Sequence, residues 1–548
     1  MKTKSLLINY NSVPYIISSL MPDNGLASLA GVLTANGHET KILDYVTVST
    51  FKRLFPYPFF NDLKSVTGRI LSDISRGTRP REDDILEFQT LDQKIDEFQR
   101  KKSVEIASDI SQEIELFHPD FLGFKLWIGE GFHGSVLMAE KIKKQYPEIK
   151  IFGGGPQVDW FNETIFKFTN VFDALARGEG EETILLLADY VLGNKNLGDI
   201  PNIITKQNGD IIRTPTKRID DLNNFAMPAY DNLIYPALVG DEKVKIFFVE
   251  EIRGCPQKCN FCIHPLKSGS KWRPKTASRV VNEIENVLEM CDTDYIRFSG
   301  SNPSPNIKRD VAREILIRDL DVKYTSFAHP KIIRTEDYKL IKESGGYILF
   351  FGVESGNLSI LQKGINKGTT PDLIRKALKA ARDAGIRSVA SFIFPAPYET
   401  EETRRETLDL ITETRPDSIV VSPPAIVLGT EWGNNSTQYG FKILKPETFD
   451  IDMLTYKAKY SVPPVLWQPL PYNLGGKTFS EYSAECNNFI MDVESKGILT
   501  QMTDDMILMA MKAGIEPKEF RNTTRTLFSL GDYQGISDLV KKINKGTE

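Results

Sequence analysis

Between residues 245 and 422, short β-type runs alternate with helix-like stretches, and this alternation limits the fold more than any other feature. The β-type runs cover residues 245–252, 294–298, 324–328, 347–352, 388–394 and 417–422. The helix-like stretches between them cover residues 277–290, 310–316, 335–343, 371–384 and 401–414. Because no return strand interrupts this order, we predict a partial, TIM-like β/α barrel whose chemistry lies at the carboxyl ends of its strands.

Three cysteines follow the first of these strands on a loop that contains Gly and Pro. Three residues separate Cys255 from Cys259, and two separate Cys259 from Cys262. Iron–sulfur clusters are usually held by four cysteine thiolates, so three would leave one iron open to a substrate or cosubstrate. The alternative is a zinc site in which Cys255 or His264 completes the pair Cys259 and Cys262, since zinc accepts Cys and His at short spacings. The remaining two of the five cysteines stand alone and offer no second ligand pair.

With an aromatic residue, Phe261, directly before the last cysteine, this triplet resembles the cluster loop of the radical S-adenosylmethionine (SAM) superfamily. The resemblance implies a 4Fe-4S cluster bound by the three cysteines, which are then both metal ligands and catalytic residues. It also implies SAM as a cofactor on the open iron. The superfamily's radical chemistry begins when the reduced cluster cleaves SAM.

Further strand ends of the barrel resemble SAM-binding motifs of the same superfamily. The run that ends in Glu354-Ser355-Gly356 is similar to its Gly-x-Glu-Ser-Gly motif, and a carboxylate at a strand end suits a ribose diol or an ammonium. The stretch Ser299-Gly300-Ser301 departs from the usual acidic pattern, so backbone carbonyls or hydroxyls would have to serve there. The SAM-binding residues that the resemblance implies are Phe261, Ser299, Gly300, Ser301, Glu354 and Ser391.

Residues 1–200 predict a doubly wound α/β domain with a charged helical insertion at about 47–116. Its β-type runs cover residues 4–10, 39–45, 121–126, 150–152 and 172–176. Gly-rich turns at 22–26, 153–156 and 178–182 follow strands of this domain. Because open α/β sheets bind ligands at the carboxyl ends of their strands, these turns indicate a ligand site.

The order of these turns resembles the cobalamin-binding domain found upstream of one branch of radical SAM enzymes. No Asp-x-His-x-x-Gly motif is present, so we expect no axial histidine to cobalt. In that branch the corrin abuts the loop after the third strand, which makes Trp127 a candidate for packing against it; a tryptophan buried against the next domain is the alternative. The cobalamin-binding residues implied are Tyr10, Gly25, Leu26, Lys125, Leu126, Trp127, Gly154, Gly155, Pro156, Gly178, Glu179 and Gly180.

At 548 residues the chain should form about two to four domains. After the cobalamin-binding domain we expect a linker at 201–240, with a small hairpin around an Asn-Gly turn. The radical SAM domain then covers 241–425, and 426–548 form a mainly helical C-terminal cap. The predicted fold class is therefore α/β, with a doubly wound domain, a partial barrel and a helical cap.

The composition of the chain limits which partners it can bind and in which cellular compartment we expect it. The 68 basic and 73 acidic residues give a net charge of −5, so bulk charge indicates no nucleic-acid or membrane-surface partner. The N-terminus runs into a strand rather than a long apolar segment, and no run is long enough to span a membrane. Five cysteines in so long a chain argue against a disulfide scaffold. We expect a cytoplasmic protein.

Together the resemblances imply a cobalamin-dependent radical SAM methyltransferase that acts on a small molecule. It would methylate an unactivated carbon or a phosphinate phosphorus, with methylcobalamin as methyl donor and a flavodoxin or ferredoxin as electron donor. The Ser-Gly-Ser loop and a C-terminal Gly-Gly-Lys resemble the phosphinate P-methyltransferases. A cobalamin-dependent cyclase or rearrangement enzyme, and a cobalamin and iron–sulfur sensor without turnover, remain alternatives. A methylthiotransferase usually needs a second cysteine cluster, and no cysteine precedes Cys255.

Overall fold

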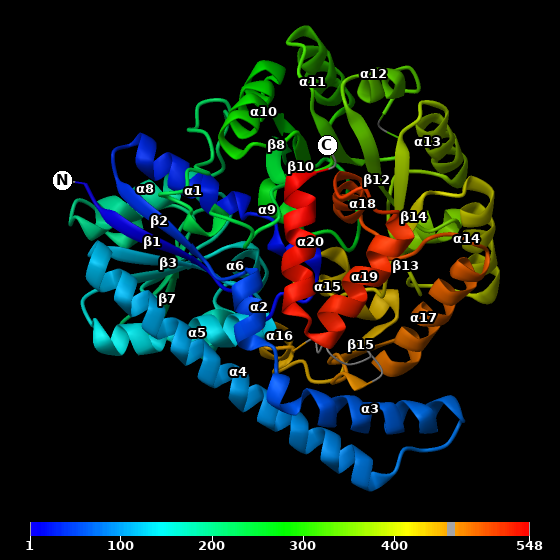
Figure 1. Cartoon of the computed structure of the whole chain (residues 1–548), viewed down its shortest axis with the longest axis horizontal. Helices are drawn as coiled ribbons and strands as arrows, with labels where there is room; N and C mark the ends of the chain where they lie inside the picture. The colour runs from blue at the N-terminus through cyan, green and yellow to red at the C-terminus, as the bar shows by residue number, and fades with distance from the viewer. Residues whose placement is uncertain (1, 332, 458–465, 547–548) are drawn as a thin grey trace.

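A seven-stranded sheet organises the N-terminal part of the computed structural model, which describes residues 2–331, 333–457 and 466–546. The strand order is β2-β1-β3-β4-β5-β6-β7, and β1 to β5 run parallel (Figure 1). The strands are β1 (Lys4–Asn9), β2 (Glu39–Asp44), β3 (Phe121–Lys125), β4 (Lys150–Gly154), β5 (Ala174–Ala176), β6 (Ile203–Gln207) and β7 (Asp210–Arg213). The first five have the strand order of a doubly wound sheet, in which ligands bind where the order reverses, between β1 and β3.

Helices cover both faces of this sheet, so its strands are nearly continuous apolar runs. In β1, Leu6, Leu7 and Ile8 are all buried. The helices are α1 (Asn24–Ala35), α5 (Gly129–Gln145), α6 (Pro156–Phe161), α7 (Thr164–Phe168) and α8 (Glu181–Val191). The antiparallel hairpin β6–β7 pairs with β5, so the sheet extends past residue 200 into the segment expected to be a linker.

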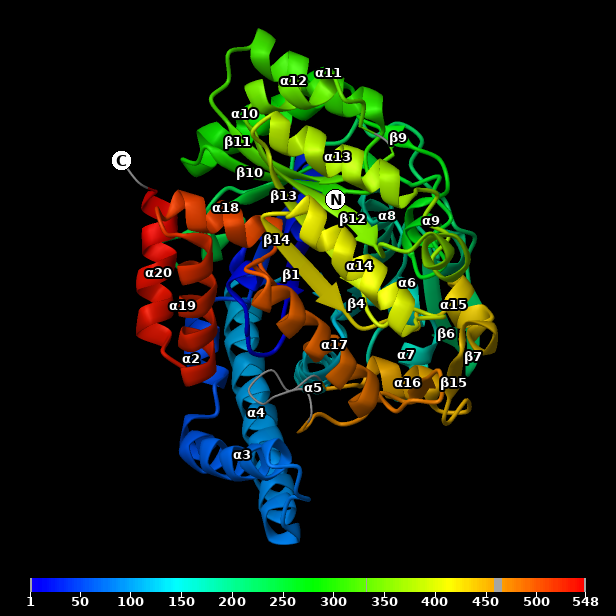
Figure 2. The same cartoon turned by 90° about the vertical axis from the view of Figure 1, so that its right-hand side faces the viewer.

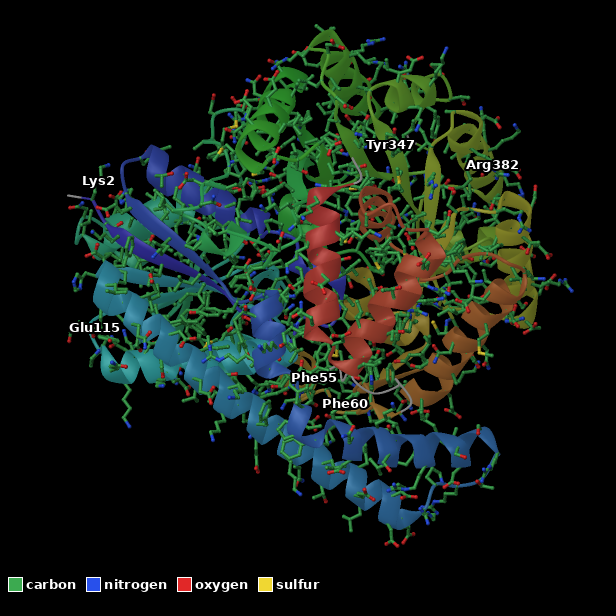
Figure 3. All side chains as sticks on the ribbon, viewed as in Figure 1. Lys2, Phe55, Phe60, Glu115, Tyr347 and Arg382 are labelled. Atoms are coloured by element: carbon green, nitrogen blue, oxygen red, sulfur yellow. The ribbon has the colours of Figure 1, made fainter. Side chains whose placement is uncertain are left out.

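The insertion after β2 is helical, as its composition predicts. It contains α2 (Val48–Leu54), α3 (Phe60–Ser75) and α4 (Glu82–Phe117). The C-terminal half of α4 packs on α5, while α3 and the N-terminal half of α4 project from the body as a hairpin (Figures 1 and 2). Phe55 and Phe60 lie where α2 leads into α3 (Figure 3), with ring centroids 5.4 Å apart.

The central part is the predicted partial barrel. Its sheet has the order β14-β13-β12-β11-β10-β8-β9, in which every strand except the short β9 (Arg273–Pro274) runs parallel. The parallel strands are β8 (Phe247–Arg253), β10 (Tyr295–Gly300), β11 (Lys323–Ala328), β12 (Gly346–Glu354), β13 (Arg387–Ile393) and β14 (Ser418–Ser422). The short α9 (His264–Ser268) directly follows the cysteine loop, and the outer helices are α10 (Ala277–Cys291), α11 (Pro305–Ile317), α12 (Asp337–Glu343), α13 (Pro371–Asp383) and α14 (Glu401–Thr414).

The C-terminal region is mainly helical, and two of its short strands, β15 and β16, pair antiparallel. Its elements are α15 (Glu431–Asn434), β15 (Phe441–Ile443), α16 (Phe449–Leu454), β16 (Tyr472–Leu474), α17 (Phe479–Ser495), α18 (Asp504–Lys512), α19 (Pro517–Leu530) and α20 (Tyr533–Lys545). Helix α18 packs on β10, β11 and β12, where Asp504 accepts hydrogen bonds from Arg297 and Thr325 at 2.8–3.0 Å. Helix α20 packs on α2, so this region ties the barrel to the N-terminal insertion. Within the described ranges, no helix combines the length and the apolar character that crossing a bilayer requires.

Candidate functional site

A cavity of about 390 Å³ lies between the N-terminal sheet and the barrel. All three Gly-rich turns contribute to its wall. The predicted cobalamin-binding residues that line it are Gly25, Leu26, Lys125, Gly154, Gly155, Pro156, Gly178, Glu179 and Gly180. Leu7, Phe152 and Ile184 add an apolar surface beneath the turns. The structure therefore brings together the carboxyl ends of β1, β3, β4 and β5 around one apolar space, as the strand order predicts.

Three of the predicted cobalamin-binding residues lie outside this lining. Tyr10 is buried on the side of the sheet that α4 covers, and its hydroxyl lies 2.9 Å from Ser103 Oγ. Leu126 is buried in the same core. Trp127 is half-buried, and its indole donates to Asn9 Oδ1 at 3.0 Å. Tyr10 and Leu126 lie outside the lining because their side chains point into the packed core and away from the cavity.

The opposite wall of the cavity comes from the barrel. It includes Arg253 at the end of β8, Gly300 and Ser301 at the end of β10, and Lys267 in α9, directly after the cysteine loop. Gly300 has a φ of +103°, and a Cβ there would lie 2.3 Å from the Ile252 carbonyl oxygen. Only glycine fits this close approach of β10 to β8. Gly300 and Ser301, which the sequence predicts to lie near SAM, therefore line the cavity.

Ion pairs join the two walls. Arg253 pairs with Glu181 from the N-terminal domain and with Glu250 of its own strand. Arg273 pairs with Glu179, whose carboxylate also accepts the Ile219 N–H at 2.7 Å. The carboxylate of Glu179, predicted to bind cobalamin, is thus occupied in holding the domains together.

The cysteine loop is shaped by a glycine and clamped by a second loop. Gly254 has a φ of +79°, and a Cβ there would lie 2.0 Å from the Lys271 carbonyl oxygen. Asn260 donates its backbone N–H to Ile365 O at 2.8 Å and its amide to Gly364 O at 3.1 Å. The fully buried Trp432 donates its indole N–H to the same Gly364 oxygen at 2.9 Å. Backbone contacts therefore fix the loop that carries the thiols.

The three thiols act on one another electrostatically. Burial is the main cause that raises the pKa of Cys259 to about 11; the Lys367 ammonium opposes this shift, and negative charge on Glu354, Cys262 or Cys255 contributes to it. Burial raises the pKa of the other two thiols as well. Thiols of this kind stay protonated until a metal displaces the proton. Among the residues described, no group of three or more Cys, His, Asp and Glu side chains is arranged to hold a single metal ion.

Three mutually coupled thiols beside one buried ammonium fit an anionic iron–sulfur cluster. The ammonium belongs to Lys367, whose Nζ lies 2.7 Å from Glu354 Oε1 and 6.0 Å from the centre of the Phe261 ring. Ser391 Oγ donates to the other oxygen of Glu354 at 3.4 Å. Three predicted SAM-binding residues thus gather at the ends of β12 and β13, next to the cysteines.

Sequence reasoning missed Lys367. It is one of 68 basic residues, and nothing local distinguishes it except the neighbouring Gly364 and Gly368 of its turn. Sequence reasoning also missed His329, which follows β11 and is buried. Its Nδ1 accepts the Lys331 N–H at 3.2 Å, and its Nε2 lies 3.1 Å from the Lys367 carbonyl oxygen. This geometry requires a neutral imidazole with its proton on Nε2.

The fold and the site define an α/β protein in which a doubly wound ligand-binding domain faces a partial β/α barrel with a three-cysteine loop. Residues 249–411 match the family model of the radical SAM superfamily, and this match includes the three cysteines and Glu354. Residues 249–411 therefore form a radical SAM domain.

Three relatives and one solved structure are among the known proteins that resemble this chain. An uncharacterized methyltransferase of Pyrococcus horikoshii is 30% identical over 55% of this chain and 66% of its own length. An anaerobic magnesium-protoporphyrin IX monomethyl ester cyclase of Rubrivivax gelatinosus is 24% identical over 62% of this chain and 64% of its own length. In both alignments the chain spans slightly less than two thirds of the relative.

A cytidylyl-2-hydroxyethylphosphonate methyltransferase of Streptomyces wedmorensis is 22% identical over 84% of this chain and 85% of its own length. The radical S-adenosylmethionine methyltransferase TsrM of Kitasatospora setae, solved with cobalamin and a [4Fe-4S] cluster bound, covers this whole chain and 99% of its own with a TM-score of 0.63. At 15% identity, this likeness shows the fold. It confirms the predicted succession of doubly wound domain, partial barrel and helical C-terminal region.

Proposed function

We propose that this protein is a cobalamin-dependent radical SAM methyltransferase. One observation carries the proposal: the cavity between the two domains joins the three Gly-rich turns to the strand ends of the cysteine-bearing barrel. Its volume and apolar floor suit part of a large, flat organic cofactor. A protein with two cofactors needs a shared space of this kind, in which a substrate reaches both.

Each cofactor has its own set of residues in this proposal. Cys255, Cys259 and Cys262 would hold the 4Fe-4S cluster, and Glu354 with Ser391 would bind SAM. The cavity would hold part of cobalamin. When bound, the cluster and SAM supply a radical that removes unreactive hydrogens, and cobalamin supplies the methyl group.

The protein's own residues position these groups and keep the site dry. Lys367 holds the Glu354 carboxylate in place at the end of β12, with both side chains at least nine-tenths buried. Trp432 and the 364–368 turn cover the outside of the cysteine loop. Exclusion of water protects a reactive radical from side reactions.

The acceptor of the methyl group is either an unactivated carbon or a phosphinate phosphorus. The Streptomyces wedmorensis relative, which aligns over most of both chains, is named for methylation of a phosphonate compound, so it supports a phosphorus-containing substrate. A small-molecule substrate, a flavodoxin or ferredoxin as electron donor, and a cytoplasmic location belong to the same proposal.

A cyclase is the second candidate, because the Rubrivivax gelatinosus relative carries that name. The products separate the two activities. Methyl transfer forms S-adenosylhomocysteine beside 5′-deoxyadenosine, whereas a rearrangement forms only the latter. A sensor without turnover would form neither.

Anaerobic reconstitution with iron, sulfide and hydroxocobalamin tests the two-cofactor proposal. We expect about four irons and one cobalt per chain after desalting. Four irons without cobalt would leave a radical SAM enzyme whose N-terminal domain binds something else, and methyl transfer through cobalt would be abandoned.

A further inference from the structure

A second, smaller pocket adjoins the interdomain cavity and has a different character. Its volume is about 240 Å³. It shares Asp159, Gly178 and Lys267 with the larger cavity. Its remaining wall comes from α6, the turn after β5, the segment before the barrel, the end of the cysteine loop with α9, and the loop after β14. We call it the basic pocket, because its lining includes Arg177, Arg218 and Lys267.

The three cations of the basic pocket lack acidic partners. Among the described residues, none of them has a carboxylate oxygen within 4.0 Å. Arg177 Nη2 donates to Thr214 O at 2.8 Å, and Arg218 Nη2 donates to Leu266 O at 2.9 Å. Arg177 and Lys267 are partly buried, so an anion in the pocket would stabilise them.

Two buried donors of the basic pocket have no acceptor. Arg177 Nε and the Trp160 indole nitrogen are both buried and make no hydrogen bond in the described part of the chain. Burial, followed by the nearby Arg213, lowers the pKa of Arg177, and the opposing effects of Asp159 and Glu163 do not offset it. Leaving buried donors unpaired is costly, so such groups usually mark a place where a ligand completes the hydrogen bonds.

The basic pocket also contains one acidic residue, which reduces its positive charge but does not cancel it. Asp159 lines the pocket, but its Oδ1 accepts the Gly178 N–H at 2.5 Å. Burial raises the pKa of Asp159, with Lys267 and Arg177 acting in the other direction. Three cations against one carboxylate leave the lining positively charged.

We propose that the basic pocket binds a phosphate- or phosphonate-type anion. A guanidinium presents planar, paired donors that match such oxygens, and Lys267 adds a point charge at the junction with the larger cavity. The anion belongs either to the methyl-accepting substrate or to the nucleotide tail of cobalamin. The pocket's wall at Ile263 and Lys267 directly follows Cys262, so a substrate anchored there lies beside both cofactor sites. The choice of source rests on the proposed function, but the anion site itself does not.

The test uses methylphosphonate as the probe, with binding measured by calorimetry on the full chain with and without bound cobalamin. We expect the wild type to bind methylphosphonate and Lys267→Met and Arg177→Met to bind it about tenfold more weakly, since each loses a charged hydrogen-bond donor. Lys271→Met, an exposed lysine four residues from Lys267, should bind like the wild type. Circular dichroism verifies that each variant is folded.

The same variants distinguish the two sources. If the anion belongs to the substrate, cobalamin-loaded protein binds methylphosphonate and the variants keep their affinity for hydroxocobalamin. If it belongs to cobalamin, the variants lose affinity for hydroxocobalamin but not for cobinamide, which lacks the nucleotide tail. Absence of both effects overturns the proposal. Failure of the proposed function would look different: no cobalt is retained, while methylphosphonate still binds.

Discussion

Burial gives several side chains of the site an unusual chemistry. Cys259 is a weakly acidic thiol until metal replaces its proton, since burial raises its pKa. We expect Cys259→Ala to abolish stable iron binding and the formation of both 5′-deoxyadenosine and S-adenosylhomocysteine, while hydroxocobalamin still binds in the separate cavity. Iron analysis, product chromatography and the visible spectrum measure these effects. Retained SAM cleavage would refute the cluster assignment.

Lys367 is the cation that stabilises the buried carboxylate of Glu354. Both side chains are less than one-tenth exposed and 2.7 Å apart. Lys367→Met leaves a buried carboxylate without its cation, so we expect the free energy of unfolding to fall by about 3–5 kcal/mol. Denaturant titration measures this. Lys363→Met, an exposed lysine of the same turn, is the control and should change stability by less than about 0.5 kcal/mol. Equal effects would contradict the role of the pair.

His329 makes stability depend on pH. Burial, followed by the charge of Lys367, lowers its pKa to about 4 from 6.5, so the unfolded chain binds the proton more tightly than the native one. The stabilisation is complete above pH 6.5 and is lost as pH falls towards 4. Between pH 6.5 and 5 this costs about 2 kcal/mol of unfolding free energy.

Unfolding measured at pH 7 and pH 5 tests this dependence. The loss of stability should be smaller in His329→Gln than in the wild type. The exposed His118 serves as the matched control, because His118→Asn keeps a residue that tolerates its positive φ and should retain the full loss. The same slope in all three proteins would show that His329 does not titrate in this way.

At the scale of the element, the cysteine loop depends on one glycine. Gly254 and Gly240 both have a positive φ, but only at Gly254 would a Cβ collide with backbone. We expect Gly240→Ala to cost about 1–2 kcal/mol through its conformation alone. Gly254→Ala must in addition displace the loop from the Lys271 carbonyl, so it should lose most of its bound iron after reconstitution. Iron content equal to that of Gly240→Ala would contradict this account.

At the scale of the whole molecule, the domain interface forms the cofactor cavity. The Arg273 pair with Glu179 links the turn after β5, which lines the cavity, to β9 of the barrel. We expect Arg273→Met to weaken hydroxocobalamin binding by about tenfold or more, because a buried carboxylate loses its partner and the walls separate. Iron content should stay unchanged. The control is Arg318→Met, since Arg318 pairs with Glu285 and Glu314 within the barrel. Equal cobalamin affinity in both variants would contradict the role of the interface.

Local sequence features determined much about this protein. The spacing of Cys255, Cys259 and Cys262, the strand and helix alternation and the three Gly-rich turns depend on residues that are neighbours in the chain. For this reason the sequence alone predicted both sheets, the helical insertion and the cavity-lining glycines. It also predicted that Glu354 and Ser391 lie at neighbouring strand ends, because consecutive parallel strands of a barrel end at the same edge.

Only the tertiary structure decided how distant side chains meet. The pairing of Lys367 with Glu354, the capture of Glu179 by Arg273 and the gathering of Arg177, Arg218 and Lys267 in one pocket depend on how elements from separate domains pack. Side-chain direction at a strand end likewise placed Tyr10 in the core rather than in the cavity. Each of these contacts depends on burial and charge at residues far apart in the chain. A local sequence pattern therefore cannot predict them.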